Sequence, residues 1–166
     1  MNTKLRGRTR NEIRCLLGLV LLMIPLAAYS HVQEQGTARS QAVDPAMSQK
    51  LATAYDYHEL ALLYIRKGEP EEAVAEARKM IDLRIPPPFE QSVAESVSII
   101  TQKLAETGRY ESSQNLLDDA LKAMVEPANQ VRILRTKARL YKLAGDDDRA
   151  IESWRRAQEL ESRRTP

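Results

Sequence analysis

Cysteine and histidine are nearly absent from this chain of 166 residues, which holds one cysteine, Cys15, and two histidines, His31 and His58. A disulfide within the chain needs two cysteines, and a zinc or iron site needs several histidine, cysteine or carboxylate ligands at suitable spacing. The sequence contains no such cluster, no phosphate-binding glycine-rich loop and no nucleophile motif. We therefore expect no metal, no cofactor and no catalytic residue, and the chain is predicted not to be an enzyme.

Aromatic residues are also few, with one Phe, one Trp and six Tyr making up 5% of the chain. They do not alternate with basic residues, as they would on a surface that stacks nucleic-acid bases. Hydrophobic residues make up 43%, enough for one core, and alanine and leucine are frequent among them. This composition favours an all-α fold and gives no indication of nucleic-acid binding.

Long apolar runs are limited to the N-terminus, where an uncharged run of fifteen residues, 15–29, follows a basic stretch and precedes small residues that end at Ser30. This order is typical of a signal peptide cleaved after Ala28 or Ser30. A membrane-spanning helix needs about 17 to 25 residues, and Pro25 weakens one further. Residues 1–30 are therefore predicted to be a signal peptide, with an uncleaved membrane anchor and a buried core helix as the alternatives. The basic residues are Lys4, Arg6, Arg8, Arg10 and Arg14.

Removal of residues 1–30 changes the charge balance. The whole chain has a formal net charge of +2, from 25 Lys and Arg against 23 Asp and Glu. Five of the basic residues and one of the acidic ones lie in the first thirty positions, so the remainder has a net charge of −2.

Residues 31–45 show no apolar period and are predicted to be a flexible tether. Asp44 and Pro45 suit the start of a first helix, so the folded domain is predicted to span 46–166.

A local pattern occurs three times in that domain: an amphipathic stretch ends at a glycine, and a second stretch begins with a small residue five positions later. The pairs are Gly68 with Ala73, Gly108 with Ser113, and Gly145 with Ala150. Glycine suits the left-handed residue that ends a helix. Apolar residues on both sides recur at helical spacing, so the pattern predicts three antiparallel helical hairpins. The six predicted helices are 47–67, 70–83, 89–106, 110–124, 127–143 and 147–162.

These hairpins resemble the tetratricopeptide repeat, a helix-turn-helix unit of about 34 residues. The third copy carries the resemblance in Leu134, Ala138, Tyr141, Gly145, Ala150, Trp154 and Ala157. The first carries it in Tyr57, Leu60, Ala61, Tyr64, Gly68, Ala73, Ala77 and Met80, and the second is degenerate. The resemblance implies a short right-handed α-solenoid with repeats at about 54–85, 90–126 and 128–162. Lys137 departs from it at a usually apolar position, and the connection through the three prolines 86–88 is longer than usual.

One group of basic residues within this pattern is a candidate binding site. Four cations of one predicted helix follow each other at spacings of three, four and three, which places them on one helix face. They are Arg132, Arg135, Arg139 and Lys142. In the resembled family these positions line the concave groove, and the matching positions in the first copy are Tyr55, His58 and Leu62. We expect a partner's acidic segment or C-terminal carboxylate to bind the cations and its apolar side chains to contact Tyr55 and Leu62. The alternative is a solvated helix face balanced by acids of neighbouring helices.

The function expected from these features is that of a noncatalytic, bacterial-type scaffold or adaptor, exported to the periplasm or secreted, which binds a protein or peptide in its groove. One alternative is an inner-membrane-tethered assembly factor that keeps residues 1–30 as its anchor. A third hypothesis is a small-ligand carrier or hydrolase on a helical scaffold, which would need a closed polar pocket near Tyr55, His58 and Arg139.

Overall fold

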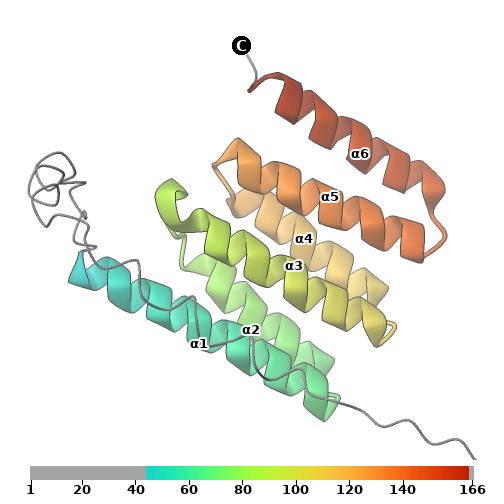
Figure 1. Ribbon diagram of the computed structural model, residues 1–166. Coiled ribbons are helices and arrows are strands. Elements are labelled where there is room, and N and C mark those ends of the chain that lie inside the picture. The colour runs from blue at the N-terminus through green and yellow to red at the C-terminus, as the bar shows by residue number, and fades with distance from the viewer. Residues whose placement is uncertain (1–43, 165–166) are drawn as a thin grey trace, which may run out of the picture. The chain divides into compact units, whose positions relative to one another are not determined.

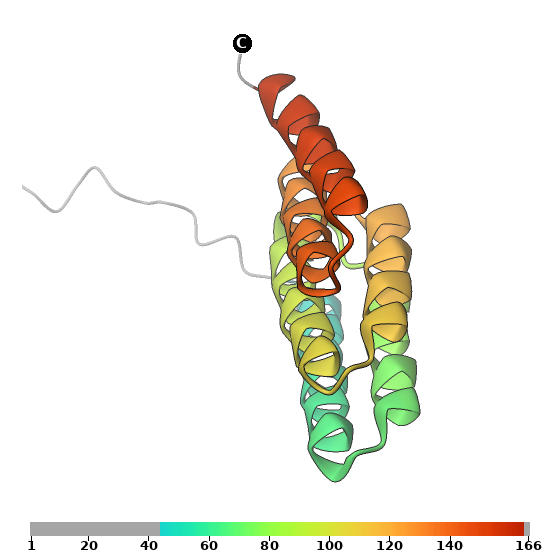
Figure 2. The ribbon, with the colours of Figure 1, turned by 90° about the vertical axis from the view of Figure 1, so that its right-hand side faces the viewer.

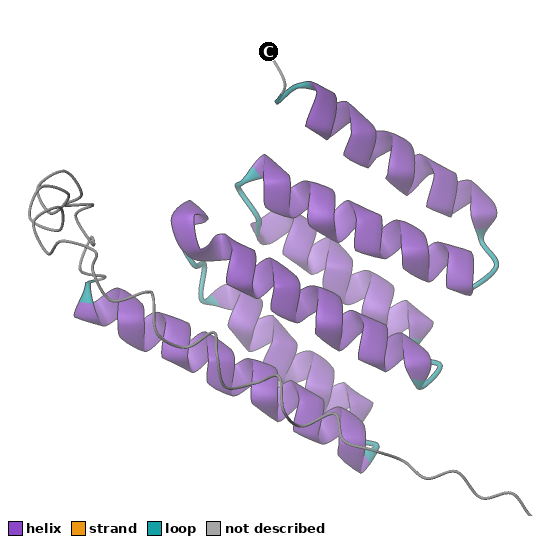
Figure 3. Ribbon diagram, viewed as in Figure 1, coloured by secondary structure: helices purple, strands orange, loops and turns teal. Residues whose placement is uncertain are grey.

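The computed structural model describes residues 44–164, and these form six α-helices joined by short loops (Figures 1 and 3). The predicted signal segment 1–30 and most of the predicted tether lie outside the described residues. Among the described helices, none has the length and apolar character that a membrane crossing requires. The helices are α1 (Pro45–Lys67), α2 (Pro70–Asp82), α3 (Glu90–Glu106), α4 (Tyr110–Ala123), α5 (Pro127–Leu143) and α6 (Asp147–Ser162), and a 3-10 turn, η1 (Pro87–Phe89), precedes α3.

The first five helices form two layers. The first layer contains α1, α3 and α5, each packed against the next, and the second contains α2 and α4 (Figure 2). Within each hairpin the two helices pack antiparallel, α1 with α2 and α3 with α4. The buried residues between the layers form one continuous core over the stacked hairpins. The predicted all-α helical repeat fold is confirmed.

The three glycine turns have the same geometry. Gly68, Gly108 and Gly145 have φ of 78°, 80° and 78°, which is the left-handed conformation that glycine adopts without strain. At Gly145 the backbone N–H donates to the Lys142 carbonyl at 3.1 Å, and the next N–H, of Asp146, donates to the Tyr141 carbonyl at 2.9 Å. The other two turns repeat both bonds at the same offsets. The repeated pattern in the sequence is therefore a repeated helix-ending motif.

Small residues lie where the two helices of a hairpin cross. Thr101 of α3 and Ser113 of α4 are both fully buried, and the Ser113 hydroxyl donates to the Thr101 carbonyl at 3.0 Å. A larger side chain at either position would separate the helices, because interiors are packed without spare volume. Alanines occupy the equivalent buried positions of the first and third hairpins: Ala61, Ala73, Ala138 and Ala150.

The last helix departs from the two-layer order. α2 packs against α4, but no such packing joins α4 to α6, which lies against α5 alone (Figure 2). The contact face of α6 also differs at one position: Trp154 is only partly buried, although its counterparts Ala77 and Leu117 are fully buried. Val131, Leu134 and Ala157 form a small core separate from the main one. The third hairpin is thus attached to the stack through α5.

Lys137, the residue at a usually apolar position, lies between polar and aromatic neighbours. Its ammonium pairs with the carboxylate of Asp118 on α4 and lies 5.6 Å from the centroid of the Tyr141 ring. Only 14% of the side chain is exposed, so its methylene groups are buried while its charge is matched. A lysine is accommodated here because α4 supplies the opposite charge.

Candidate interaction surface

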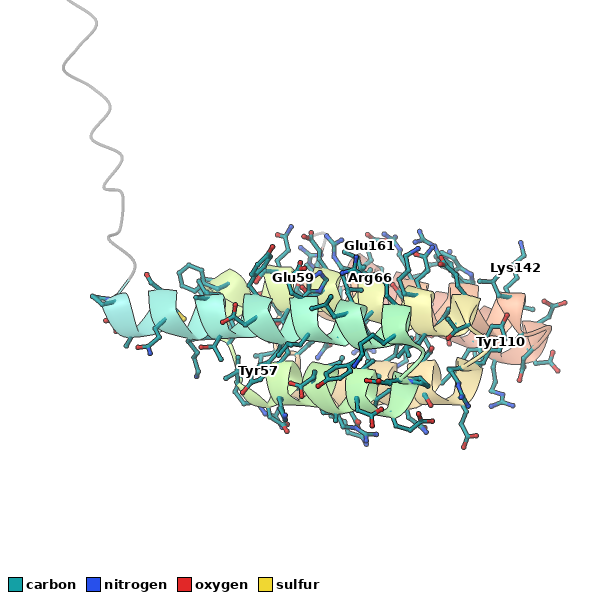
Figure 4. The ribbon with its side chains drawn as sticks, turned by 90° about the horizontal axis from the view of Figure 1, so that it is seen from below. Tyr57, Glu59, Arg66, Tyr110, Lys142 and Glu161 are labelled. Atoms are coloured by element: carbon teal, nitrogen blue, oxygen red, sulfur yellow. The ribbon has the colours of Figure 1, made fainter. Side chains whose placement is uncertain are left out.

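The cations of α5 lie on the side of the first layer that faces away from α2 and α4. Lys142 and, from α6, Glu161 project on that side (Figure 4). Three of the predicted cations line a surface pocket of about 380 Å³, which we call the arginine pocket. The residues that define it are Arg132, Arg135 and Arg139 of α5, Ser98 of α3, and Glu161 and Arg164 at the C-terminal end of α6.

Two of the pocket arginines have carboxylate partners from neighbouring helices. Arg132 Nη2 lies 3.1 Å from Glu95 Oε1 of α3, and Arg135 Nη2 lies 2.5 Å from Glu161 Oε2 of α6. No ion pair within residues 44–164 involves Arg139 or Lys142. The like-charge repulsion expected along α5 is therefore relieved at Arg132 and Arg135 and remains at the other two positions.

The floor of the pocket is polar and joins α3 to α5. The Thr136 hydroxyl of α5 lies 3.2 Å from the Ser98 hydroxyl of α3 and 3.1 Å from the Arg132 carbonyl, and its single proton can be donated to either. Thr136 is buried, and Ser98 also donates to the Ala94 carbonyl. The contact between the two hydroxyls joins the arginine-bearing face of α5 to α3.

A second pocket of about 260 Å³ adjoins the first along α5, and we call it the Leu143 pocket. Ser98, Thr136 and Arg139 line both pockets, so the two are continuous. The Leu143 pocket differs in carrying large apolar side chains at its surface: Ile99 is 47% exposed and Leu143 is 66% exposed. A cationic hollow and an apolar one therefore lie next to each other on the same face.

The α1 residues predicted to share this surface do not line either pocket. Tyr55 is 64% exposed and lines a different pocket, of about 230 Å³, between α1 and α3. The His58 ring lies 6.4 Å from the Tyr55 ring, and its Nδ1 is buried with no hydrogen-bond partner among the described residues. Leu62 is partly buried against the core. The structure therefore brings together Arg132, Arg135 and Arg139 in one pocket, but neither Lys142 nor the α1 residues line that pocket with them.

The titration of Tyr55 is shifted by one neighbour. The negative charge of Glu59, and then its hydrogen bond to the phenol, raise the pKa of Tyr55 above its ordinary value. Tyr55 is therefore a neutral hydrogen-bonding aromatic residue near neutral pH. Tyr55 and Arg139 line separate pockets, so they do not form a common polar site with His58. Within residues 44–164, no group of three or more His, Cys, Asp or Glu residues is placed to hold a metal ion.

The surface also contains residues that were not predicted from the sequence, among them Ile99, Leu143, Glu161 and Arg164. Ile99 and Leu143 flank the predicted groove positions by one residue. Glu161 and Arg164 reach the surface from the C-terminal end of α6, which packs on α5. By contrast, Ala105 of α3 is 3% exposed and belongs to the core. The repeat pattern places Ala105 in register with Lys142, three residues before the turn glycine, so it corresponds to a predicted groove position.

The stacked hairpins with their shared core and identical turns define a helical repeat protein. Residues 57–84, which cover most of the first hairpin, match the family model described as tetratricopeptide repeat. This match supports the tetratricopeptide repeat resemblance for the first hairpin, and the second and third hairpins repeat its turn geometry. No curated protein matches the chain. Proteins of this family are generally noncatalytic scaffolds for protein interactions.

Proposed function

We propose that this protein is a noncatalytic scaffold that binds an acidic protein segment on its first-layer face, with the arginine pocket as the main contact. The observation that supports the proposal is the composition of that pocket, to which α5 and the end of α6 contribute four arginines. Guanidinium groups form bidentate hydrogen bonds with carboxylates, so a cluster of them favours a ligand with acidic side chains.

The charge balance of the pocket supports an acidic partner. Glu95 and Glu161 neutralise two of the four arginines, and no ion pair among the described residues involves Arg139. An acidic segment would supply the missing negative charge and relieve the repulsion between neighbouring cations. Further along the same face, the partner's chain contacts Tyr55, His58 and Leu62 of α1, which offer aromatic and apolar surface.

We also propose that the protein acts outside the cytoplasm, in the bacterial periplasm or in the secreted space. This rests on the basic, apolar and small-residue order of residues 1–30. N-terminal sequencing of the protein made in a bacterial host tests it. A first residue at Tyr29 or His31 supports export with cleavage, whereas an intact start at Met1 in the membrane fraction favours the tethered alternative.

Charge reversal tests the binding surface. The variant Arg135→Glu/Arg139→Glu and a control variant Arg155→Glu/Arg156→Glu, whose exposed residues lie on α6, receive the same change of net charge. Capture experiments at low salt with extracts of the source cells are compared among both variants and the unaltered protein. We expect the partner to be lost only with the pocket variant. Equal capture by all three proteins would overturn the proposed surface.

A further inference from the structure

The two adjoining pockets differ in chemistry, and two pocket arginines already bind carboxylates of this chain. We propose that the site recognises an extended peptide segment with two acidic side chains and one large apolar side chain, and that the two acids replace Glu95 and Glu161. This inference rests on the proposed function, because it specifies the ligand of the same surface.

The number of acids follows from the ion pairs. Arg132 and Arg135 each bind one carboxylate of this chain, from Glu95 and Glu161. A ligand that replaces both carboxylates therefore needs two acidic side chains. The internal partners are easily exchanged, because the side chains of Glu95 and Glu161 are 44% and 48% exposed and such ion pairs contribute little net stability. Each glutamate thus occupies an arginine that a ligand can bind, and acts as an internal competitor.

The spacing of the ligand follows from the positions of the pockets along α5. Eight residues separate Arg132 from Leu140, and eight separate Arg135 from Leu143. At 1.5 Å per residue this corresponds to about 12 Å along the helix axis. An extended chain advances about 3.3 Å per residue, so the distance corresponds to about three to four residues. The apolar side chain is therefore expected three or four positions from the nearest acid.

The large apolar side chain of the ligand is inferred from the exposed apolar side chains of the Leu143 pocket. Leu143 and Ile99 are largely exposed in the free protein, and they lie beside Arg139, which lines both pockets. A large aliphatic or aromatic side chain seated between them would remove apolar area from water on both partners. A purely acidic segment would leave this area exposed and would bind through charge alone.

Labelled synthetic peptides test the inference. Each peptide carries an Asp-Glu pair and one Leu in a Gly-Ser chain, with the separation varied from about one to about six residues. Binding is measured at low salt by fluorescence anisotropy, and the site is located by NMR amide shifts of the full mature chain. We expect peptides with a separation of three or four to bind at least about threefold tighter than the others. The largest amide shifts are expected at Ser98, Thr136, Arg139 and Leu143.

Two pairs of matched variants test the competition. Glu161→Gln removes the internal competitor and is expected to tighten peptide binding about two- to fivefold, whereas Glu159→Gln on the same helix leaves it unchanged. Arg139→Gln is expected to weaken binding about fivefold or more, with Arg155→Gln as its control. All four residues are exposed or at the surface, so the fold is retained.

Several results would overturn the inference: no measurable peptide binding, equal affinity at all separations, amide shifts outside the two pockets, or unchanged or weaker binding by Glu161→Gln. The proposed function fails separately, when the charge-reversed protein captures its partner as well as the unaltered one. If capture depends on Arg135 and Arg139 but the peptides do not bind, the scaffold function stands and the peptide pattern is wrong.

Discussion

The buried carboxylate of Glu90, at the start of α3, joins the second hairpin to the third. The side chain is almost fully buried, and its two oxygens accept hydrogen bonds from the backbone N–H groups of Val125 and Glu126, at 2.7 and 2.9 Å. The Asn129 amide donates a third bond at 3.0 Å. A buried charge is tolerated when hydrogen bonds replace its hydration. Glu90 therefore fixes the connection from which α5, and with it the arginine pocket, begins.

We predict that Glu90→Ala lowers the free energy of unfolding by about 3 kcal/mol, because it leaves the buried Asn129 amide and two part-buried backbone N–H groups without their partner. Glu90→Gln retains one acceptor oxygen and should cost less. Urea denaturation followed by circular dichroism measures both changes. The exposed residue Glu106 of the same helix is a control, and Glu106→Ala should leave the free energy of unfolding nearly unchanged. A similar small loss for Glu90→Ala would show that the bonds of Glu90 contribute little.

At the scale of elements, the helices were largely predictable because each carries its own signals. The predicted bounds differ from the observed ones by at most two residues. Proline at the first positions, as at Pro70 and Pro127, and glycine at the turns account for this agreement. The largest difference is at the start of α1, which begins at Pro45 and not at residue 47, whereas α3 begins at Glu90, one residue later than predicted, because Phe89 belongs to η1.

The packing of α6 could not be predicted from its sequence. Helical periodicity shows that one side of α6 is apolar, but not which helices that side contacts. The repeat pattern places Trp154 in register with the fully buried Ala77 and Leu117, yet Trp154 is only partly buried. Among the described helices α4 and α6 do not pack together, and the C-terminal end of α6 brings Glu161 to the arginine pocket.

We predict that α6 unfolds locally more readily than the other helices, because it packs against α5 alone. The core between α5 and α6 is small and contains Val131, Leu134 and Ala157. Native-state hydrogen exchange at increasing urea measures the free energy of opening for each helix. The amides of α6 should exchange through an opening of lower free energy than those of α3. If α6 and α3 exchange through the same global opening, the third hairpin is as firmly attached as the others.

At the scale of the whole molecule, the candidate surface was predicted only in part. The spacing of Arg132, Arg135 and Arg139 indicates a common helix face, and the structure places all three in one pocket. Their carboxylate partners come from α3 and α6, and the apolar surface beside them comes from the α3–α5 contact. Such neighbours depend on how helices stack, so a periodicity within one helix could not identify them.

The same limit applies to the first repeat. Tyr55, His58 and Leu62 occupy the positions that correspond to the cations in the repeat pattern, yet they lie on α1 and line no pocket in common with the cations. α3 lies between α1 and α5 in the first layer, so equivalent positions are separated by a whole helix. The repeat pattern predicts which helix face a residue lies on, but it does not predict which residues lie next to it in space.

Site-specific photo-crosslinking in living cells tests the central claim, that the face carrying the arginine pocket binds the partner. A photoreactive side chain replaces Gln102, which lines the Leu143 pocket, or the exposed residue Asn115 of α4 in the second layer. We predict a specific adduct from position 102 that disappears in the Arg135→Glu/Arg139→Glu variant, and none from position 115. An adduct from position 115 alone, or one from position 102 that survives charge reversal, would contradict the account.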